Sequence, residues 1–165
     1  MAELTNLESK LAEVLGLAEA SKGAAETVKG MLDDDEQDLA STLEQMRDEA
    51  SETAERCTEV AGDFDGKKTA ILEAARETKQ EATEMMKTYL EGEDDALDGF
   101  EFLTMAEAGE VGHWAIVRKL NERAQSEAIQ ELVDWALPVQ EEHLSVVLKS
   151  ALDLAGREDP NEVAE

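Results

Sequence analysis

The chain has 165 residues, enough to bury one core, and its 4% aromatic content with abundant Ala, Leu, Glu and Lys is typical of helical proteins. Its formal charge of −26, from 41 acidic and 15 basic residues, argues against nucleic acids and anionic membranes as partners, because both are negatively charged. Solubility explains such a surface, and the alternative is the attraction of cations.

The first half of the chain predicts three helices. Residues 4–32 and residues 36–64 each carry apolar side chains three and four positions apart, which is the helical pattern. The glycine-containing segment 62–66 is the clearest loop, and a shorter helix follows over residues 67–90. In the shorter helix the expected inward residues are Ile71, Leu72, Ala75, Ala82, Met85, Met86 and Tyr89.

The second half predicts two long helices, over residues 96–123 and 126–155. The expected inward residues of the first are Leu103, Ala106, Glu110, His113, Val117 and Leu120, and those of the second include Leu132, Ala136, Val139, His143, Val147 and Leu154. Gly156 suits a helix C-cap, and residues 157–165 form an acidic tail. We therefore expect one domain over residues 1–156.

The helix pattern predicts an all-α fold. No run alternates like a β-strand, and the sequence contains two prolines, so long stretches have nothing to break a helix. Long helices paired first with second and fourth with fifth, with a longer connection between the pairs, describe a four-helix bundle with an extra crossover helix. In such bundles, metal sites lie in the core on inward-facing side chains.

The location is expected to be the cytoplasm. Cys57 is the single cysteine and cannot form an internal disulfide, which favours a reducing compartment. The N-terminal residues are charged and lack the apolar core of a signal peptide. No window approaches the roughly 18 apolar residues of a membrane span.

The most distinctive chemical feature is the pair Glu110 and His113. They are three residues apart, so they point the same way from one helix face, which we predict to be the core face. A buried carboxylate costs several kcal/mol unless it is paired, neutralised or bound to a metal. The pair is therefore a candidate for two ligands of one metal ion, or for a simple hydrogen-bonded pair.

The second histidine, His143, also lies on a predicted inward stripe. Gln140 stands three residues before it, where a second Glu-x-x-His motif would need a carboxylate, and Glu142 lies at the edge of the stripe. On the first two helices Glu19 and Glu49 flank the apolar stripes without lying in them. Each of these glutamates is either a ligand or part of a solvated helix edge.

With the helices placed, the chain resembles the ferritin-like superfamily, and within it the YciF-like bacterial branch. The resemblance rests on five segments: residues 17–20, the acidic residues 48–56, the loop 62–68 with its short helix, residues 106–114 with two glutamates three apart before an aromatic residue, and residues 140–143. It implies a bundle that holds two iron or manganese ions and oxidises iron or handles peroxide in oxidative stress.

By this resemblance the metal ligands would be Glu19, Glu49, Glu110, His113 and Glu142, with His143 as a further ligand. The sequence departs from the family where Thr53 stands near an expected histidine and where Gln140 replaces a carboxylate. These departures leave open a single-metal protein, or a metal-free helical scaffold or interaction protein. Either function is compatible with a homo-oligomer.

Overall fold

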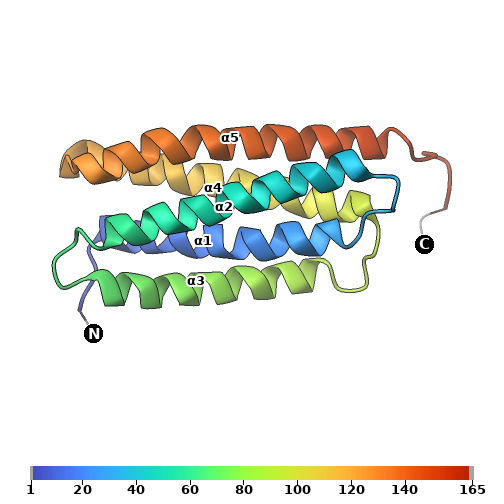
Figure 1. Ribbon diagram of the computed structural model, residues 1–165. Coiled ribbons are helices and arrows are strands. Elements are labelled where there is room, and N and C mark those ends of the chain that lie inside the picture. Colours follow the sequence, from blue (N-terminus) through green and yellow to red (C-terminus); the bar gives the residue numbers. More distant parts are fainter. Residues whose placement is uncertain (1, 164–165) are drawn as a thin grey trace.

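The structure is a computed structural model, and it describes residues 2–163. Within this range the chain forms five helices and no strand: α1 Asn6–Lys29, α2 Gln37–Ala61, α3 Lys68–Tyr89, α4 Ala96–Ala124 and α5 Glu127–Ala155 (Figure 1). The predicted all-α class is confirmed, and Gly156 caps α5. Residue 1 of the expected domain and residues 164–165 of the expected tail lie outside the described residues.

All five helices lie side by side along one axis, and consecutive helices run in opposite directions (Figure 1). The helix α1 contacts α2 and α4, and α5 contacts the same two helices, so these four form a closed ring. The remaining helix, α3, packs on α1 and touches α2. It returns the chain to the end of the molecule where α4 begins. The predicted pairing of first with second and fourth with fifth helices is confirmed.

Local sequence explains where the helices begin. Thr5 and Glu8 form a capping box at the start of α1, in which the Glu8 amide donates to the Thr5 hydroxyl and the Thr5 amide donates to the Glu8 carboxylate. Asp95 and Ser126 accept hydrogen bonds from the first-turn amides of α4 and α5. The loop before α3 contains Gly66 at a positive φ of 69°, which glycine adopts without steric cost.

Two glycines allow α1 to approach its neighbours closely. A Cβ atom at Gly16 would lie 2.4 Å from the backbone oxygen of Ala75 on α3. A Cβ atom at Gly99 on α4 would lie 2.8 Å from a methyl group of Val28. Both distances are well below van der Waals contact, so these positions set how near α3 and α4 come to α1.

The core contains two separate apolar clusters. One includes Leu11 and Leu15 of α1, Cys57 of α2, Trp114 of α4 and Val133 of α5. The other is built from residues nearer the opposite end of the bundle, among them Val28, Leu43, Phe100, Leu103 and Val147. Both clusters draw on α1, α2, α4 and α5, so the bundle is packed at both ends.

Two predicted inward faces are correct only in part: Leu103, Glu110 and Val117 on α4 and Ile71, Ala75 and Met86 on α3 are buried as expected, and other members are not. The buried face of α4 carries Phe100, Leu103, Glu107, Glu110, Trp114 and Val117, so it is rotated from the predicted stripe, and His113 is only half-buried. On α3, Met85 and Tyr89 are exposed although we expected them to point inward, because α3 packs on one side of the bundle and buries only a narrow face.

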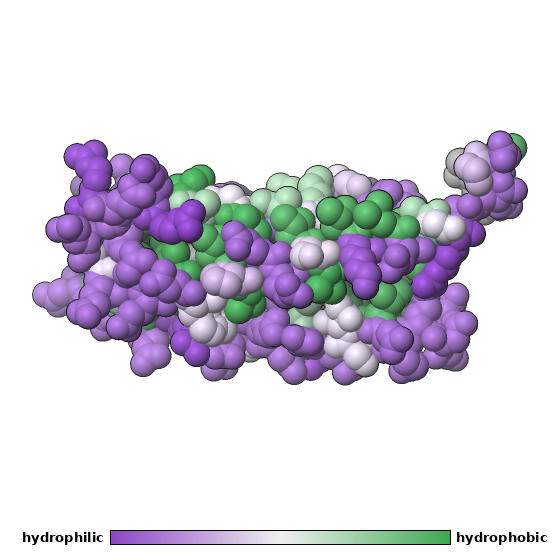
Figure 2. All heavy atoms as spheres, turned by 90° about the horizontal axis from the view of Figure 1, so that it is seen from above, coloured by the Kyte–Doolittle hydropathy of each residue, from purple (hydrophilic) through white to green (hydrophobic). Residues whose placement is uncertain are grey.

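The surface is acidic with an apolar component. Seen from the side of α5, apolar atoms form an interrupted band between hydrophilic ends (Figure 2). Leu148 and Leu152, one turn apart on α5, are both exposed. The homo-oligomer stays a prediction.

None of the described helices has an apolar stretch long enough to cross a membrane.

Candidate functional site

Polar side chains occupy the middle of the bundle, between the two apolar clusters. On α5, for example, Gln140 and His143 lie between Leu137 of one cluster and Val147 of the other. The same interruption occurs on the other three helices of the ring. We call this set the polar layer, and it comprises Ser21 on α1, Glu49 and Thr53 on α2, Glu107 and Glu110 on α4, and Gln140 and His143 on α5.

His143 is buried at the centre of the polar layer and lies between two carboxylates. Its Nε2 atom is 2.6 Å from Oε2 of Glu49, and its Nδ1 atom is 3.5 Å from Oε2 of Glu107. Burial alone would lower the pKa of His143, but the hydrogen bonds and negative charges of Glu107 and Glu49 outweigh it, so the pKa is raised. The carboxylates therefore favour the protonated imidazolium in the absence of another cation.

Glu107 receives a second buried partner from α5. The side-chain amide of Gln140 donates a hydrogen bond to Oε2 of Glu107. A glutamate at position 140 would place a second acceptor there and would repel Glu107. The residue that departs from the Glu-x-x-His pattern is therefore the one that provides a hydrogen-bond donor to the buried carboxylate.

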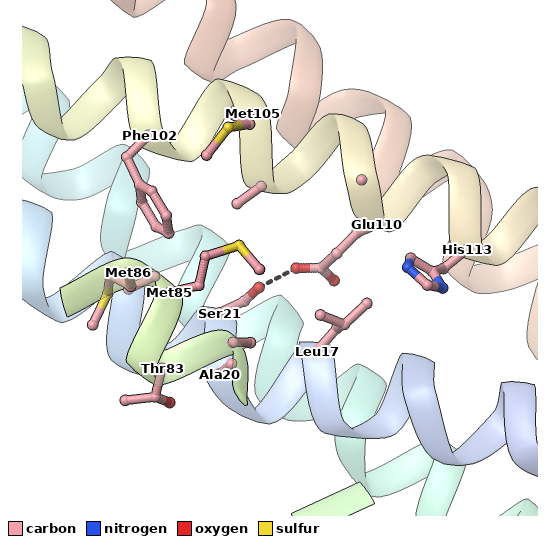
Figure 3. Close-up of a pocket in the computed structure, with 14 residues that line it drawn as sticks. Leu17, Ala20, Ser21, Thr83, Met85, Met86, Phe102, Met105, Glu110 and His113 are labelled. Carbon is pink, nitrogen blue, oxygen red and sulfur yellow. Dashed lines mark hydrogen bonds between the residues drawn. The ribbon is translucent and has the colours of Figure 1, made fainter. Parts of the chain in front are cut away.

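Glu110 lies one turn further along α4 and faces α1. Its carboxyl group accepts a hydrogen bond from the Ser21 hydroxyl (Figure 3). Burial raises the pKa of Glu110 to about 8, and the nearby charge of Glu107 raises it too, while the Ser21 hydrogen bond and the charge of His143 lower it. At neutral pH this carboxyl group is therefore mostly protonated.

A cavity of about 250 Å³ adjoins Glu110 between α1, α3 and α4. Its walls are mainly apolar, Phe102 and Glu110 project toward it from α4 (Figure 3), and Met105 also lines it. The half-buried side chain of His113 also lines it. The cavity is separate in its lining from the Glu49, Gln140 and His143 side of the polar layer.

Of the six residues predicted as metal ligands, Glu49 and His143 contact each other, and Glu110 lies in the same layer but bonds Ser21 on α1. The other three have different surroundings. Glu19 pairs with Lys22 and Lys79, and these cations outweigh its partial burial and lower its pKa. His113 lies with Nδ1 3.1 Å from Oε2 of Glu13, and Glu142 is exposed.

No protein-family model, curated protein or solved structure matches the chain.

The central residue that sequence reasoning missed as a site residue is Glu107. It lies in the segment that resembles the ferritin-like family, but the apolar pattern predicts that Ala106, and not Glu107, faces inward. The spacing of Phe100, Leu103, Trp114 and Val117 is the signal that identifies the buried face, because two large aromatic residues lie on it. Glu107 and Glu110 fill the gaps in that repeat.

The polar layer contains the side-chain types that bind metals, but they are not arranged as a complete set of ligands. Carboxylate oxygens and an imidazole nitrogen suit divalent ions such as iron and manganese. Among the described residues, however, no three His, Cys, Asp or Glu side chains are arranged as a ready set of ligands. The side chains instead form hydrogen bonds with one another, and an ion would have to replace some of these.

Proposed function

We propose that this protein is a ferritin-like bundle that binds a single metal ion, iron or manganese, in its polar layer. The observation that carries the proposal is the buried imidazole of His143, which lies between the carboxylates of Glu49 and Glu107 on two other helices. Metal centres in helical bundles are built from such inward side chains on facing helices.

The helix arrangement supports the ferritin-like assignment. A ring of four helices, with α3 returning the chain between α2 and α4, has one long connection of the kind that ferritin-like bundles use. The assignment remains our proposal, and it predicts that any ion lies midway along the bundle, where the polar layer is.

The polar layer has an energetic cost. Burying carboxylates and an imidazole in a bundle that has apolar packing on both sides is unfavourable compared with apolar residues of similar size. A bound cation would offset the negative charge of Glu49 and Glu107, and the strongly acidic surface would raise the cation concentration near the protein.

Within this proposal the residues have different roles. One ring nitrogen of His143 and the carboxylate beside it would bind the ion, and the carboxylate at the other nitrogen would orient the ring. Gln140 holds Glu107 in place through its amide. Iron oxidation or protection against peroxide is the chemistry that a bound iron ion would supply.

The direct test is metal binding by the purified protein. Protein made in medium rich in iron and manganese is analysed for metal content, then stripped with a chelator and titrated with Mn²⁺ by calorimetry at high ionic strength. High salt screens the exposed carboxylates, so that the titration reports the buried site. We expect saturable binding that His143→Ala and Glu107→Gln each weaken at least ~tenfold.

Matched controls separate the polar layer from the acidic surface. Glu142→Gln changes an exposed carboxylate next to His143, and His113→Ala removes the other histidine, so both variants should bind Mn²⁺ like the unmodified protein. Glu110→Gln tests the predicted ligand Glu110 in the same titration. Equal binding by the His143→Ala variant would overturn the proposal, as would the absence of saturable uptake.

A metal-free scaffold is the second candidate, and a specific observation favours it. The buried members of the polar layer already have partners, since Ser21 bonds Glu110, Gln140 bonds Glu107 and His143 contacts Glu49. A scaffold should tolerate the double variant Glu107→Gln, His143→Leu within about 1 kcal/mol of stability, because replacing both buried partners is often neutral. The scaffold function is supported if the double variant is as stable as the unmodified protein and neither of the two binds metal.

A further inference from the structure

The cavity beside Glu110 exists because small residues line it from three helices. Ala20 and Ala24 on α1, Ala82 on α3, and Ala106 and Gly109 on α4 leave the space that larger side chains would fill. At about 250 Å³ it exceeds the roughly 150 Å³ at which an apolar protein cavity can bind benzene. The space is therefore large enough for a small organic molecule.

Two solvent-exposed methionines line this cavity. The exposed fractions of Met85 and Met105 are 61% and 47%, and both line the cavity, Met85 from α3 and Met105 from α4. Methionine side chains are unbranched and flexible, so they adapt to different guests. The buried side chains of Met86 and Phe102 provide a deeper apolar wall.

A single buried carboxyl group provides the polar end of the cavity. Glu110 is 4% exposed and accepts a hydrogen bond from Ser21 (Figure 3). A carboxyl group has lone pairs for more than one donor, so it retains capacity to accept a further hydrogen bond. An apolar space with one such acceptor is typical of a small-molecule site, in which the polar group fixes the ligand's orientation.

We propose that this cavity binds a small uncharged alcohol, with its hydroxyl group on Glu110 and its hydrocarbon part among the methionines and Phe102. A hydroxyl group needs few partners, whereas an ammonium group has three donors to satisfy and a costly charge to bury among apolar walls. A carboxylate ligand would likewise bring a charge that is costly to bury among apolar walls, and the protein's net charge of −26 would repel it.

The proposal is independent of metal binding. The cavity lining comes from α1, α3 and α4 and includes none of Glu49, Glu107 and His143. Loss of metal binding in the His143→Ala variant should therefore leave alcohol binding unchanged, and each proposal can fail without the other.

The test follows methionine methyl groups by NMR while 1-hexanol is added. In protein labelled with ¹³C at the methionine methyls, Met85, Met86 and Met105 should shift in a saturable way, and Met46 on α2 should not, because it does not line the cavity. Hexylammonium and hexanoate have the same chain with a positive or negative head group. We expect both to bind at least ~tenfold more weakly than 1-hexanol, a difference of about 1.4 kcal/mol.

Two variants fill the cavity by different routes. Ala106→Leu enlarges a half-buried wall residue, and Gly109→Leu adds a side chain at an exposed position where a Cβ atom meets nothing within 4 Å. The second should fold readily, because leucine is also a better helix former than glycine. Both should weaken 1-hexanol binding at least ~tenfold.

Three outcomes would overturn the proposal. The first is the absence of a saturable shift, and the second is an equal shift in both filled variants, which would indicate nonspecific contact. The third is tighter binding of hexylammonium than of 1-hexanol, which would make this a cation site instead.

Discussion

Glu107 and Glu110 lie one turn apart on α4 and are almost equally buried, with exposed fractions of 2% and 4%, yet they have different surroundings. Glu107 faces α5, where it meets the Gln140 amide and the His143 imidazole. Glu110 faces α1 and the cavity, where the Ser21 hydroxyl is its hydrogen-bond donor. The two residues are therefore equally buried but differ in their partners. Glu107 has two polar partners on α5, and Glu110 has one hydrogen-bond donor on α1.

The difference shows how a helix can present one residue type for two purposes. A buried carboxylate stays charged when cations and donors surround it, and takes up a proton when they do not. Glu107 lies next to a histidine whose pKa is raised, whereas the pKa of Glu110 itself is raised to about 8. The polar layer thus has one side toward α5, where a carboxylate meets an imidazole and an amide, and another toward the cavity, where the carboxyl group of Glu110 has a raised pKa.

The largest expected effect comes from replacing each glutamate with the same residue. Glu107→Leu should destabilise the protein by about 3–5 kcal/mol, because it leaves the Gln140 amide and the Nδ1 atom of His143 without their buried acceptor. Glu110→Leu should not destabilise the protein at pH 7, because the lost hydrogen bond to the half-buried Ser21, about 1 kcal/mol, is offset by removal of a carboxyl group that the folded state keeps protonated. Urea denaturation at pH 7, followed by circular dichroism, measures both. Equal losses in the two variants would remove the distinction between the two sides.

The second effect is the dependence of stability on pH. The pKa of Glu110 is about 8 in the folded protein and 4.5 in the unfolded chain, so the folded protein keeps this proton to higher pH. The folded state therefore binds more protons in this range, and stability falls as the pH rises, by about 2–3 kcal/mol between pH 5 and pH 7. Glu110→Gln should remove this decline while keeping the side chain's size.

His143 provides an internal reference for the same experiment. Its raised pKa gives a stabilisation that is present below its unfolded value of 6.5 and is lost as the pH rises through the folded value. This decline acts in the same direction as that of Glu110 but begins at higher pH, and it should persist in the Glu110→Gln variant. A variant with an unchanged slope between pH 5 and pH 6 would show that Glu110 is ionised in the folded protein.

The smallest effect is expected from Ser21→Ala. Removing the hydroxyl should cost about 0.5–1.5 kcal/mol, the usual contribution of one hydrogen bond. It should also raise the pKa of Glu110 further, because the Ser21 hydrogen bond lowers it. Carboxyl ¹³C NMR measures the pKa, and Thr27→Ala on the exposed face of α1 is the control. An unchanged pKa in the Ser21→Ala variant would argue against the hydrogen bond.

Most of the helical framework could be predicted because its signals are local. The capping residues Thr5, Asp95 and Ser126 and the loop around Gly66 lie next to the helix ends that they determine. The rotation of α4 was harder, because Ala106 and Gly109 are small enough to suit either face. Trp114 buries far more apolar surface than His113 does, and this difference selects the observed face.

The contacts within the polar layer depend on register between helices, which the apolar pattern does not specify. Ser21 and Glu110 are 89 positions apart in the sequence, and Glu49 and His143 are 94 apart. An apolar stripe tells which side of a helix is buried, but not how far that helix slides along its neighbour. Glu49 and His143 were each identified as candidates, and their contact with one another required the structure.

The burial of Trp114 gives the protein a built-in optical probe. Its indole is fully buried, and its Nε1 atom has no hydrogen-bond partner among the described residues. An indole in such dry surroundings fluoresces at shorter wavelength than one near water, such as the half-buried Trp135, whose ring lies 4.2 Å below the Arg56 guanidinium. In a Trp135→Phe protein the remaining emission would come from one residue, a helical turn from Glu110, and it would respond to changes in the centre of the bundle.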